Sequence, residues 1–261
     1  MKPSRLLMPA LVAGLCLYVL PQFMLLSRTT DTALWGRLFD PLYAAIFWRS
    51  VLMALGATIG TLLVGFPVAW ALVRAVPARF RGAFLLLVTL PLWTSVLVKL
   101  YAWVFLLRSG GLLFRVLEFM GSDSPGLLYT TTAVAIGQLY VELPYMILPI
   151  YASLERIDPS LIDAAHDLGA TPAKALWRVI IPLAAPGIVA GCVLVFVPAL
   201  GSVLVPDLLG GAKTAWVGTL ITSQFSTARD PAFGSAMAFT LSVLTLGAFL
   251  LFGRFLAKAQ E

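Results

Sequence analysis

The chain has 261 residues, of which 60% are hydrophobic and only 11% are charged. Soluble domains carry about 25% charged residues, so this sequence has too few charges to cover a water-facing surface. Its net charge of +6 does not point to nucleic acid, because the lysines and arginines delimit long apolar runs and do not gather on one polar face. The composition predicts a protein whose surroundings are the lipid bilayer, with no nucleic-acid partner.

Residues that could carry out chemistry are few. His166 is the only histidine, which excludes a histidine-based metal site or a serine triad within the chain. Cys16 and Cys192 both lie in apolar runs and are expected to be free thiols. The sequence also lacks a complete phosphate-binding loop. We therefore expect no catalytic residue, no metal and no cofactor in this chain, and the sequence does not predict an enzyme.

Six apolar runs are long enough to cross a bilayer, which requires roughly 20 mostly apolar residues per helix. The runs are residues 6–26, 50–73, 82–107, 124–154, 179–206 and 231–253. The first run is longer than the core of a typical signal peptide and no clear cleavage site follows it, so we interpret it as a membrane anchor. The sequence thus predicts an all-α membrane protein with six transmembrane helices in a single domain, residues 1–261.

Basic residues near the ends of the spans set the orientation, because they favour the cytoplasmic side. With the N-terminus inside, Arg74, Arg79, Arg81, Arg156 and Lys174 all fall on the cytoplasmic side, and fewer basic residues fall outside. We expect a multi-pass protein with both termini in the cytoplasm.

Prolines and paired glycines interrupt the spans. Proline removes a backbone donor and kinks a helix, which predicts kinks at Pro67, Pro91, Pro144, Pro149, Pro186 and Pro198. Gly56 with Gly60, and Gly187 with Gly191, are each spaced as GxxxG, a pattern that permits two helices to approach closely.

The stretch 154–185, between the fourth and fifth spans, has its own internal structure. Asp158 is a good N-cap with Pro159 at the first helical position, and Gly169 is suited to end that helix in a left-handed conformation. Thr171 with Pro172 begins a second helix, which Pro182 and Pro186 are expected to break. The pattern predicts two short helices joined by a glycine corner on the cytoplasmic face. By spacing alone, the element could also be an amphipathic cap on the bundle.

Part of this loop resembles a known family. The run Asp163, Ala164, Ala165, then Leu168, Gly169 and Ala170, followed by Ile181–Leu183 and Pro186–Gly187, looks like the EAA signature of ABC importer permeases, with Asp in place of the usual first Glu. The resemblance implies that these residues form a coupling helix that docks on an ATPase subunit, where ATP and Mg²⁺ are bound.

Further motifs are similar to the spermidine/putrescine branch of that family. They are residues 91–95, 143–151, 196–199, 207–211 and 229–234. The resemblance implies a type I importer in the bacterial inner membrane, built from two ATPase subunits, a second homologous permease and a periplasmic binding protein. It implies transport of a polyamine such as spermidine or putrescine. Because the branch includes importers of other solutes, another small amine, an amino-acid-like solute or an anion remains an alternative.

An ionisable side chain inside a transmembrane span is energetically costly, so by default it is taken to mark a substrate or ion pathway. Glu142 could face the translocation path and pair with a cationic solute, or it could pair with Lys99 or with a group on the partner permease. Trp93 and Tyr140 could stack on a cation, or they could be interfacial anchors. Asp207 could attract a cation outside the membrane, or it could be an ordinary solvated loop residue. We carry Glu142, Trp93, Tyr140 and Asp207 forward as substrate-path candidates.

Two other classes of membrane protein fit less well. An ion-coupled secondary transporter usually shows repeated halves with matching broken helices, and no such repeat is evident. A membrane-embedded enzyme needs converging catalytic groups, which the single histidine and sparse acids do not supply.

Overall fold

The computed structural model describes residues 4–29, 32–119, 126–211 and 215–258, and all regular structure in these ranges is helical. The helices, in chain order, are α1 (Ser4–Ser27), α2 (Thr32–Leu38), α3 (Pro41–Arg74), α4 (Ala78–Thr89), η1 (Leu90–Trp93), α5 (Val96–Leu107), α6 (Leu112–Phe119), α7 (Thr131–Leu154), α8 (Pro159–Asp167), α9 (Pro172–Ala175), η2 (Leu176–Ile180), α10 (Ile181–Leu200), η3 (Pro206–Gly210), α11 (Val217–Ser226) and α12 (Pro231–Lys258). The predicted all-α class is confirmed.

The centre of the molecule is the packing of α3, α7 and α10 against one another. Small residues make this packing close. A Cβ atom built on Gly187 would lie 2.4 Å from the carbonyl oxygen of Pro149, and one on Gly191 would lie 2.8 Å from the sulfur of Met146. The Gly187–Gly191 pair therefore brings α10 against α7, as its spacing predicts. In the other pair, only Gly60 is in tight contact, since a Cβ on Gly56 would meet nothing within 4 Å.

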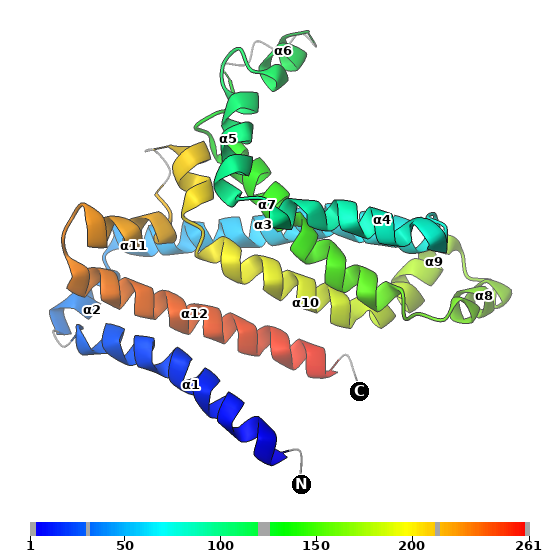
Figure 1. The fold of residues 1–261 in the computed structure, drawn as a ribbon, viewed down its shortest axis with the longest axis horizontal. Coiled ribbons are helices and arrows are strands. Elements are labelled where there is room, and N and C mark those ends of the chain that lie inside the picture. Colours follow the sequence, from blue (N-terminus) through cyan, green and yellow to red (C-terminus); the bar gives the residue numbers. More distant parts are fainter. Residues whose placement is uncertain (1–3, 30–31, 120–125, 212–214, 259–261) are drawn as a thin grey trace.

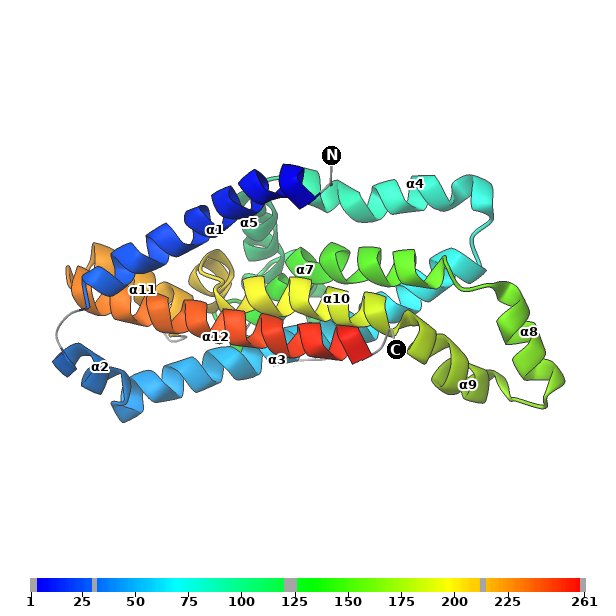
Figure 2. The same cartoon turned by 90° about the horizontal axis from the view of Figure 1, so that it is seen from below.

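The long helices run along one axis of the molecule, with different elements at its two ends (Figure 1). The helices α8 and α9 form one end, and α2 and α11 lie at the other (Figure 2). The helix α1 lies beside α12, where the Gln22 amide donates to the Ser242 hydroxyl at 3.3 Å.

The six predicted spans map onto α1, α3, α4 with α5, α7, α10 and α12. Within the described residues, five stretches are long and apolar enough to cross a membrane by length and composition: Pro41–Arg74, Val96–Val116, Thr131–Leu154, Pro172–Leu200 and Pro231–Arg254. The first predicted span lies in the 24 residues of α1. Ser124, where the sequence placed the start of the fourth span, lies outside the described residues.

The third predicted span, residues 82–107, is not one continuous helix. The chain leaves α4 through the 3₁₀ turn η1, which contains Pro91, and α5 then continues in a different direction, away from the bundle (Figure 1). Proline at this position cannot donate the hydrogen bond that would continue the helix. The predicted kink at Pro91 is thus a full helix break.

The prediction that Pro182 and Pro186 break the second loop helix is wrong. The stretch Pro172–Leu200 is one long run of helical turns, from α9 through the π-helical turn η2 into α10. Pro182 falls in the first turn of α10, and the wider turn η2 directly precedes it. A π turn changes which carbonyl each N–H reaches, so a proline after it disturbs the helix less than the α-helical pattern suggests.

Candidate functional site

The loop between α7 and α10 is built by local capping. The side chain of Asp158 accepts a hydrogen bond from the backbone N–H of Ser160 at 2.9 Å and so begins α8. Hydrogen bonds from the Ser160 backbone and side chain lower the pKa of Asp158 below its ordinary value. The Thr171 hydroxyl accepts from the N–H of Lys174 at 3.3 Å and begins α9. Both predicted caps are confirmed.

The corner between these two short helices exposes the residues that the sequence singled out. Gly169 has a φ of +77°. Leu168, directly before it, is 89% exposed. Asp163 and Ala164 are also exposed, and Ala165 and Ala170 are partly buried. Ile162 is the residue of α8 that points inward, at 7% exposed, and it joins the core.

Trp177 is a further candidate that the sequence reasoning did not select. It lies in η2 and is 69% exposed, close along the chain to the glycine corner. An exposed tryptophan at the end of a bundle is a common anchor in protein interfaces. A hollow of about 550 Å³ lies nearby, lined by Arg156 and Asp158 together with residues of α7, α8 and α10. The loop therefore presents a rigid corner with apolar side chains beside charged groups.

A second cluster surrounds the break at η1. Trp93 is 86% exposed. Tyr140 of α7 lines a small hollow with Pro91 and meets Trp103 edge-on, with ring centroids 5.6 Å apart. The ammonium of Lys99 reaches back from α5 and donates to the carbonyl oxygen of Pro91 at 2.7 Å. Trp93 and Tyr140 thus both lie at the helix break formed by η1.

Glu142 is buried, unlike Trp93 and Tyr140. It is 3% exposed, and its Oε1 accepts from the Nε2 of Gln138, one turn earlier in α7, at 3.1 Å. Its Oε2 is buried with no partner among the described residues. The predicted alternative of a direct pair with Lys99 is not formed, since the ion pair found in the described parts of the chain is between Arg37 and Asp230.

Asp207 belongs to η3, which contacts both α5 and α7. It is exposed in η3, whose other face packs onto α7 through Leu209 and Gly137. Within the described ranges, no group of three or more His, Cys, Asp or Glu side chains could hold a metal ion.

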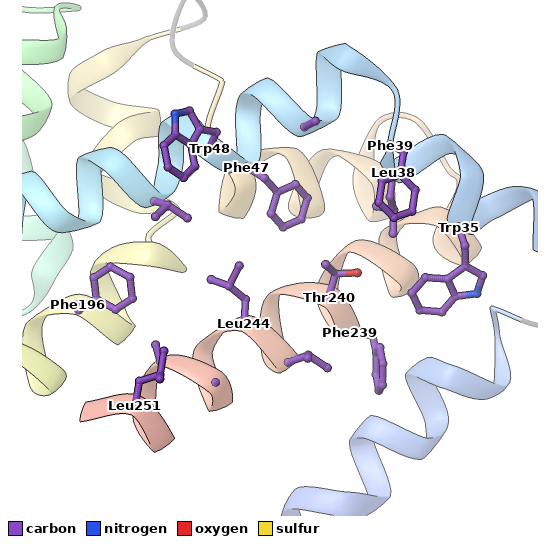
Figure 3. Close-up of a pocket in the computed structure, with 15 residues that line it drawn as sticks. Trp35, Leu38, Phe39, Phe47, Trp48, Phe196, Phe239, Thr240, Leu244 and Leu251 are labelled. Atoms are coloured by element: carbon purple, nitrogen blue, oxygen red, sulfur yellow. The ribbon is translucent and has the colours of Figure 1, made fainter. Parts of the chain in front are cut away.

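A groove of about 900 Å³ lies between α2, α3, α10 and α12, shown in Figure 3. Aromatic and aliphatic side chains line it, including Trp35, Trp48, Phe196 and Phe239. The hydroxyl of Thr240 also lines it but donates to the carbonyl of Ala236 at 2.9 Å. The groove is thus suited to hydrocarbon and offers little to a polar solute.

Comparisons with known proteins agree with this arrangement. Residues 62–260 match the family described as "Binding-protein-dependent transport system inner membrane component". The chain is 46% identical over 209 residues to the spermidine/putrescine transport system permease protein PotB of Haemophilus influenzae, covering 79% of this chain and 73% of that protein.

Solved structures show the same fold at low sequence identity. A bacterial ABC transporter that imports the acidic polysaccharide alginate superposes with a TM-score of 0.70 at 19% identity, covering 99% of this chain and 96% of that one. A second structure, of the alginate transporter in complex with a pentasaccharide-bound periplasmic protein, gives a TM-score of 0.67 at 21% identity, with 95% and 91% covered.

The family match covers most of the chain, and an exposed glycine corner and an all-helical bundle accompany it. This chain is therefore a member of the inner-membrane component family of binding-protein-dependent transport systems, and it is a permease subunit of an ABC importer.

Proposed function

We propose that this permease carries a polyamine, such as spermidine or putrescine, across the bacterial inner membrane. The observation that carries the proposal is the 46% identity to a spermidine/putrescine permease over 79% of the chain. The polyamine is received from a periplasmic binding protein. ATP and Mg²⁺ are bound by two ATPase subunits, and this chain contributes one transmembrane permease domain.

The α8–α9 corner is the docking site for an ATPase subunit. Asp163, Ala164, Ala165, Leu168, Gly169 and Ala170 form it, and exposed Leu168 with exposed Asp163 supports a docking role. A small, rigid corner transmits motion better than a mobile loop, because its own conformation is fixed by the caps at Asp158 and Thr171. ATP binding closes the two ATPase subunits and moves this corner, which turns the pathway outward, and hydrolysis resets it. The permease's own contribution to this cycle is the difference in free energy between its two conformations.

Four side chains are candidates for the substrate path. Trp93 and Tyr140 offer aromatic faces that attract ammonium groups. Asp207 offers an exposed carboxylate. Glu142, buried behind the surface of α7, acts on the solute once α7 has moved, or through Gln138.

A second, homologous permease covers the helices that project from the bundle. We call α5 and α6 together the arm; Figure 1 shows it extending from the bundle. Large apolar side chains are exposed along it: Leu97, Val98, Tyr101, Phe105, Leu112, Val116 and Phe119. Lipid can cover apolar side chains too, so the support for this proposal is the projection of the arm from the bundle, which offers a related permease a helical surface to pack against.

The orientation places the α8–α9 end in the cytoplasm, with both termini on that side. In Figures 1 and 2, α12 ends in the half of the molecule that contains α8 and α9, and α1 begins near the middle. This arrangement and the basic residues at the same end support the orientation.

The test is the ATPase activity of the reconstituted complex with its binding protein, measured with spermidine, putrescine, amino acids and anionic solutes. We expect stimulation by polyamines. The variant Leu168→Ala should lose most of it while the complex still assembles. Leu17→Ala is the matched control, because Leu17 is also a highly exposed leucine, at 76%, but lies on α1.

Three outcomes would contradict the proposal. Stimulation by an anionic solute alone would exclude the polyamine while keeping the importer. Equal stimulation in wild type and Leu168→Ala would exclude the proposed docking corner. A chain that recruits no ATPase subunit would overturn the importer assignment itself.

A further inference from the structure

The helix α4 lies between two proline breaks. Pro77 directly precedes its first residue, and Pro91 lies in η1, which directly follows its last. Figures 1 and 2 show α4 running from the end formed by α8 and α9 to the middle of the molecule, where α5 leaves the bundle. None of the twelve residues of α4 is buried. A helix with a break at each end and little packing along its length is suited to move as one rigid body.

Arg81 replaces hydrogen bonds that are lost at the first break. In a continuous helix the carbonyl of Val73 would accept from the backbone N–H four residues later, but that residue is Pro77, which has no N–H. The Nη2 of Arg81 donates to this carbonyl at 2.6 Å instead, and its Nε donates to the carbonyl of Val76 at 3.2 Å. A guanidinium holds several N–H groups in a fixed geometry, so one side chain can satisfy both carbonyls. Arg81 therefore joins the start of α4 to the end of α3.

A second basic side chain joins the other end of α4 to the arm. Lys99, in the first turn of α5, donates to the carbonyl of Pro91 in η1 at 2.7 Å. Each break is thus closed by a cation that donates to backbone carbonyls, which carry partial negative charge at the ends of helices. The helix α4 links the end of α3 to the start of the arm.

The start of α4 also shares a core cluster with α8, one of the two helices of the proposed docking corner. Ile162 is the buried residue of α8, and its cluster includes Val73 and Val76, whose carbonyls Arg81 contacts, together with Leu85 of α4. Closely packed side chains pass a displacement on to their neighbours. A movement of α8 is therefore expected to reach the place where Arg81 holds α4.

We propose that Arg81 is a positioning residue for the transport cycle. By holding the start of α4 on the end of α3, it makes α4 a rigid link that carries movement of the α8–α9 end to the break at η1 and to the arm. Arg81 acts through α4 and does not itself contact the solute or ATP. The proposal rests on the proposed docking of an ATPase subunit at the α8–α9 corner, and it does not depend on the identity of the solute.

The test is a pair of distances measured by electron spin resonance in the assembled transporter in lipid nanodiscs. With Cys16 and Cys192 replaced by alanine, one pair of spin labels is placed at Leu86 on α4 and Leu250 on α12, and another at Leu161 on α8 and Leu250. All three leucines are exposed. The distances are compared without nucleotide and after trapping with ATP and vanadate, which holds the ATPase subunits closed. We expect both distances to change on trapping.

The variant Arg81→Met removes both hydrogen bonds and keeps a long side chain. We expect the distance from α4 to stop changing, the distance from α8 to change as before, and solute uptake per ATP hydrolysed to fall severalfold. A role in stability alone would not separate the two distances. Arg79→Met is the matched control, because Arg79 is exposed in the same turn of α4 and its guanidinium lies over the ring of Phe80, 4.7 Å from the centroid. It should behave as wild type.

The outcomes separate this inference from the proposed function. An α8 distance that does not change in the wild type would overturn the docking corner, and the inference with it. A changing α8 distance with a constant α4 distance in the wild type would overturn the inference alone, and this comparison needs no variant. A full change of the α4 distance in Arg81→Met would overturn the role of Arg81.

Discussion

At the scale of single residues, glycines that look alike in the sequence differ in their backbone conformation and in the space around them. Gly169 needs a left-handed backbone but has open space around it. Gly187 has ordinary helical geometry but no space. The first can be anticipated from its place after a capped helix, whereas the second depends on which helix lies against it.

The first prediction concerns the backbone of the α8–α9 corner. Gly169→Ala should disfavour the left-handed conformation by about 1–2 kcal/mol and reduce ATPase stimulation, since no steric clash accompanies the change. The measurement is ATPase activity with binding protein and spermidine. Gly14→Ala, at an equally open glycine in a helix, is the control and should be neutral. Equal activity in both variants would show that the corner does not need this conformation.

The second prediction concerns the ion pair between Arg37 and Asp230. The Arg37 Nη1 lies 3.0 Å from the Asp230 Oδ2, and the guanidinium also lies 4.1 Å from the ring centroid of buried Phe233. The backbone N–H of Phe233 and the side chain of Arg37 both donate to Asp230, and these bonds lower the pKa of its carboxyl. A lowered pKa means that the stabilisation is present above the unfolded pKa of about 3.9 and is lost as the pH falls through the folded pKa.

Asp230→Asn removes the charge but keeps an oxygen that can cap α12. Because the pair is largely exposed, we expect a loss of only about 0–1 kcal/mol at pH 7. The difference in melting temperature between wild type and variant should shrink between pH 5 and about pH 3, as measured by thermal unfolding. A difference that stays constant over this range would argue against an electrostatic contribution.

At the scale of elements, the break at η1 shows how a buried lysine can be accommodated. Lys99 is 8% exposed, yet its ammonium donates to the Pro91 carbonyl. The hydroxyl of Thr94 donates to the same carbonyl at 3.0 Å. The end of a helix carries unpaired carbonyls and partial negative charge, which is a favourable place for a cation. The cost of burying Lys99 is offset by this contact.

The third prediction follows from that contact. Lys99→Met should destabilise the protein by about 1.5–3 kcal/mol, the range for hydrogen bonds to charged groups, and Thr94→Val by about 1 kcal/mol. Thermal unfolding of both single variants and the double variant gives the coupling between them. Strictly additive losses would indicate that the two donors do not share the carbonyl in solution.

The fourth prediction concerns the contact of α7 with α10. Gly187→Ala would place its methyl group 2.4 Å from the Pro149 carbonyl oxygen and 2.5 Å from the Ser153 Cβ, so the two helices must separate. We expect a loss of about 1–3 kcal/mol in thermal unfolding. The control Gly247→Ala meets nothing within 4 Å on α12 and should be neutral or stabilising. Equal melting temperatures for the two variants would contradict the close approach.

At the scale of the whole molecule, the arm is the part of the subunit that extends furthest from the packed helices. The core of the subunit lies where α3, α7 and α10 meet, and the arm of α5 and α6 carries exposed apolar side chains away from that core. In the proposed complex, a second permease packs on the arm and one ATPase subunit packs on the α8–α9 corner.

The fifth prediction tests that assembly. With Cys16 and Cys192 replaced by alanine, single cysteines at Val98 and Phe105 should react with a membrane-soluble maleimide in the isolated subunit and become protected when the second permease is added. These positions are 66% and 60% exposed. The control cysteine at Leu250, 58% exposed on α12, should react equally in both states. Unchanged reactivity on the arm would exclude it as the contact surface.

The sequence by itself determined the features that depend on neighbouring residues along the chain. Apolar runs of about 20 residues with few or no charges indicated the spans, because burying a charge in lipid is costly. Asp158, Thr171 and Gly169 determined the corner between α8 and α9, because capping and left-handed turns are local. The motifs of that corner also indicated the family that the comparisons then showed.

Only the tertiary structure decided the features that depend on contacts between distant segments. The course of α10 through Pro182 depends on a π turn that the residue pattern does not reveal. Glu142 and Tyr140 are two residues apart on α7 and lie on different faces of the helix, and tertiary packing covers Glu142 to 3% exposure but leaves Tyr140 37% exposed. Gln138 and Trp216, 78 positions apart by their numbers, line one small hollow because α3, α7 and α10 leave space between them. Periodicity can show that a residue is in a helix, but which neighbour it meets is fixed by packing across the whole bundle.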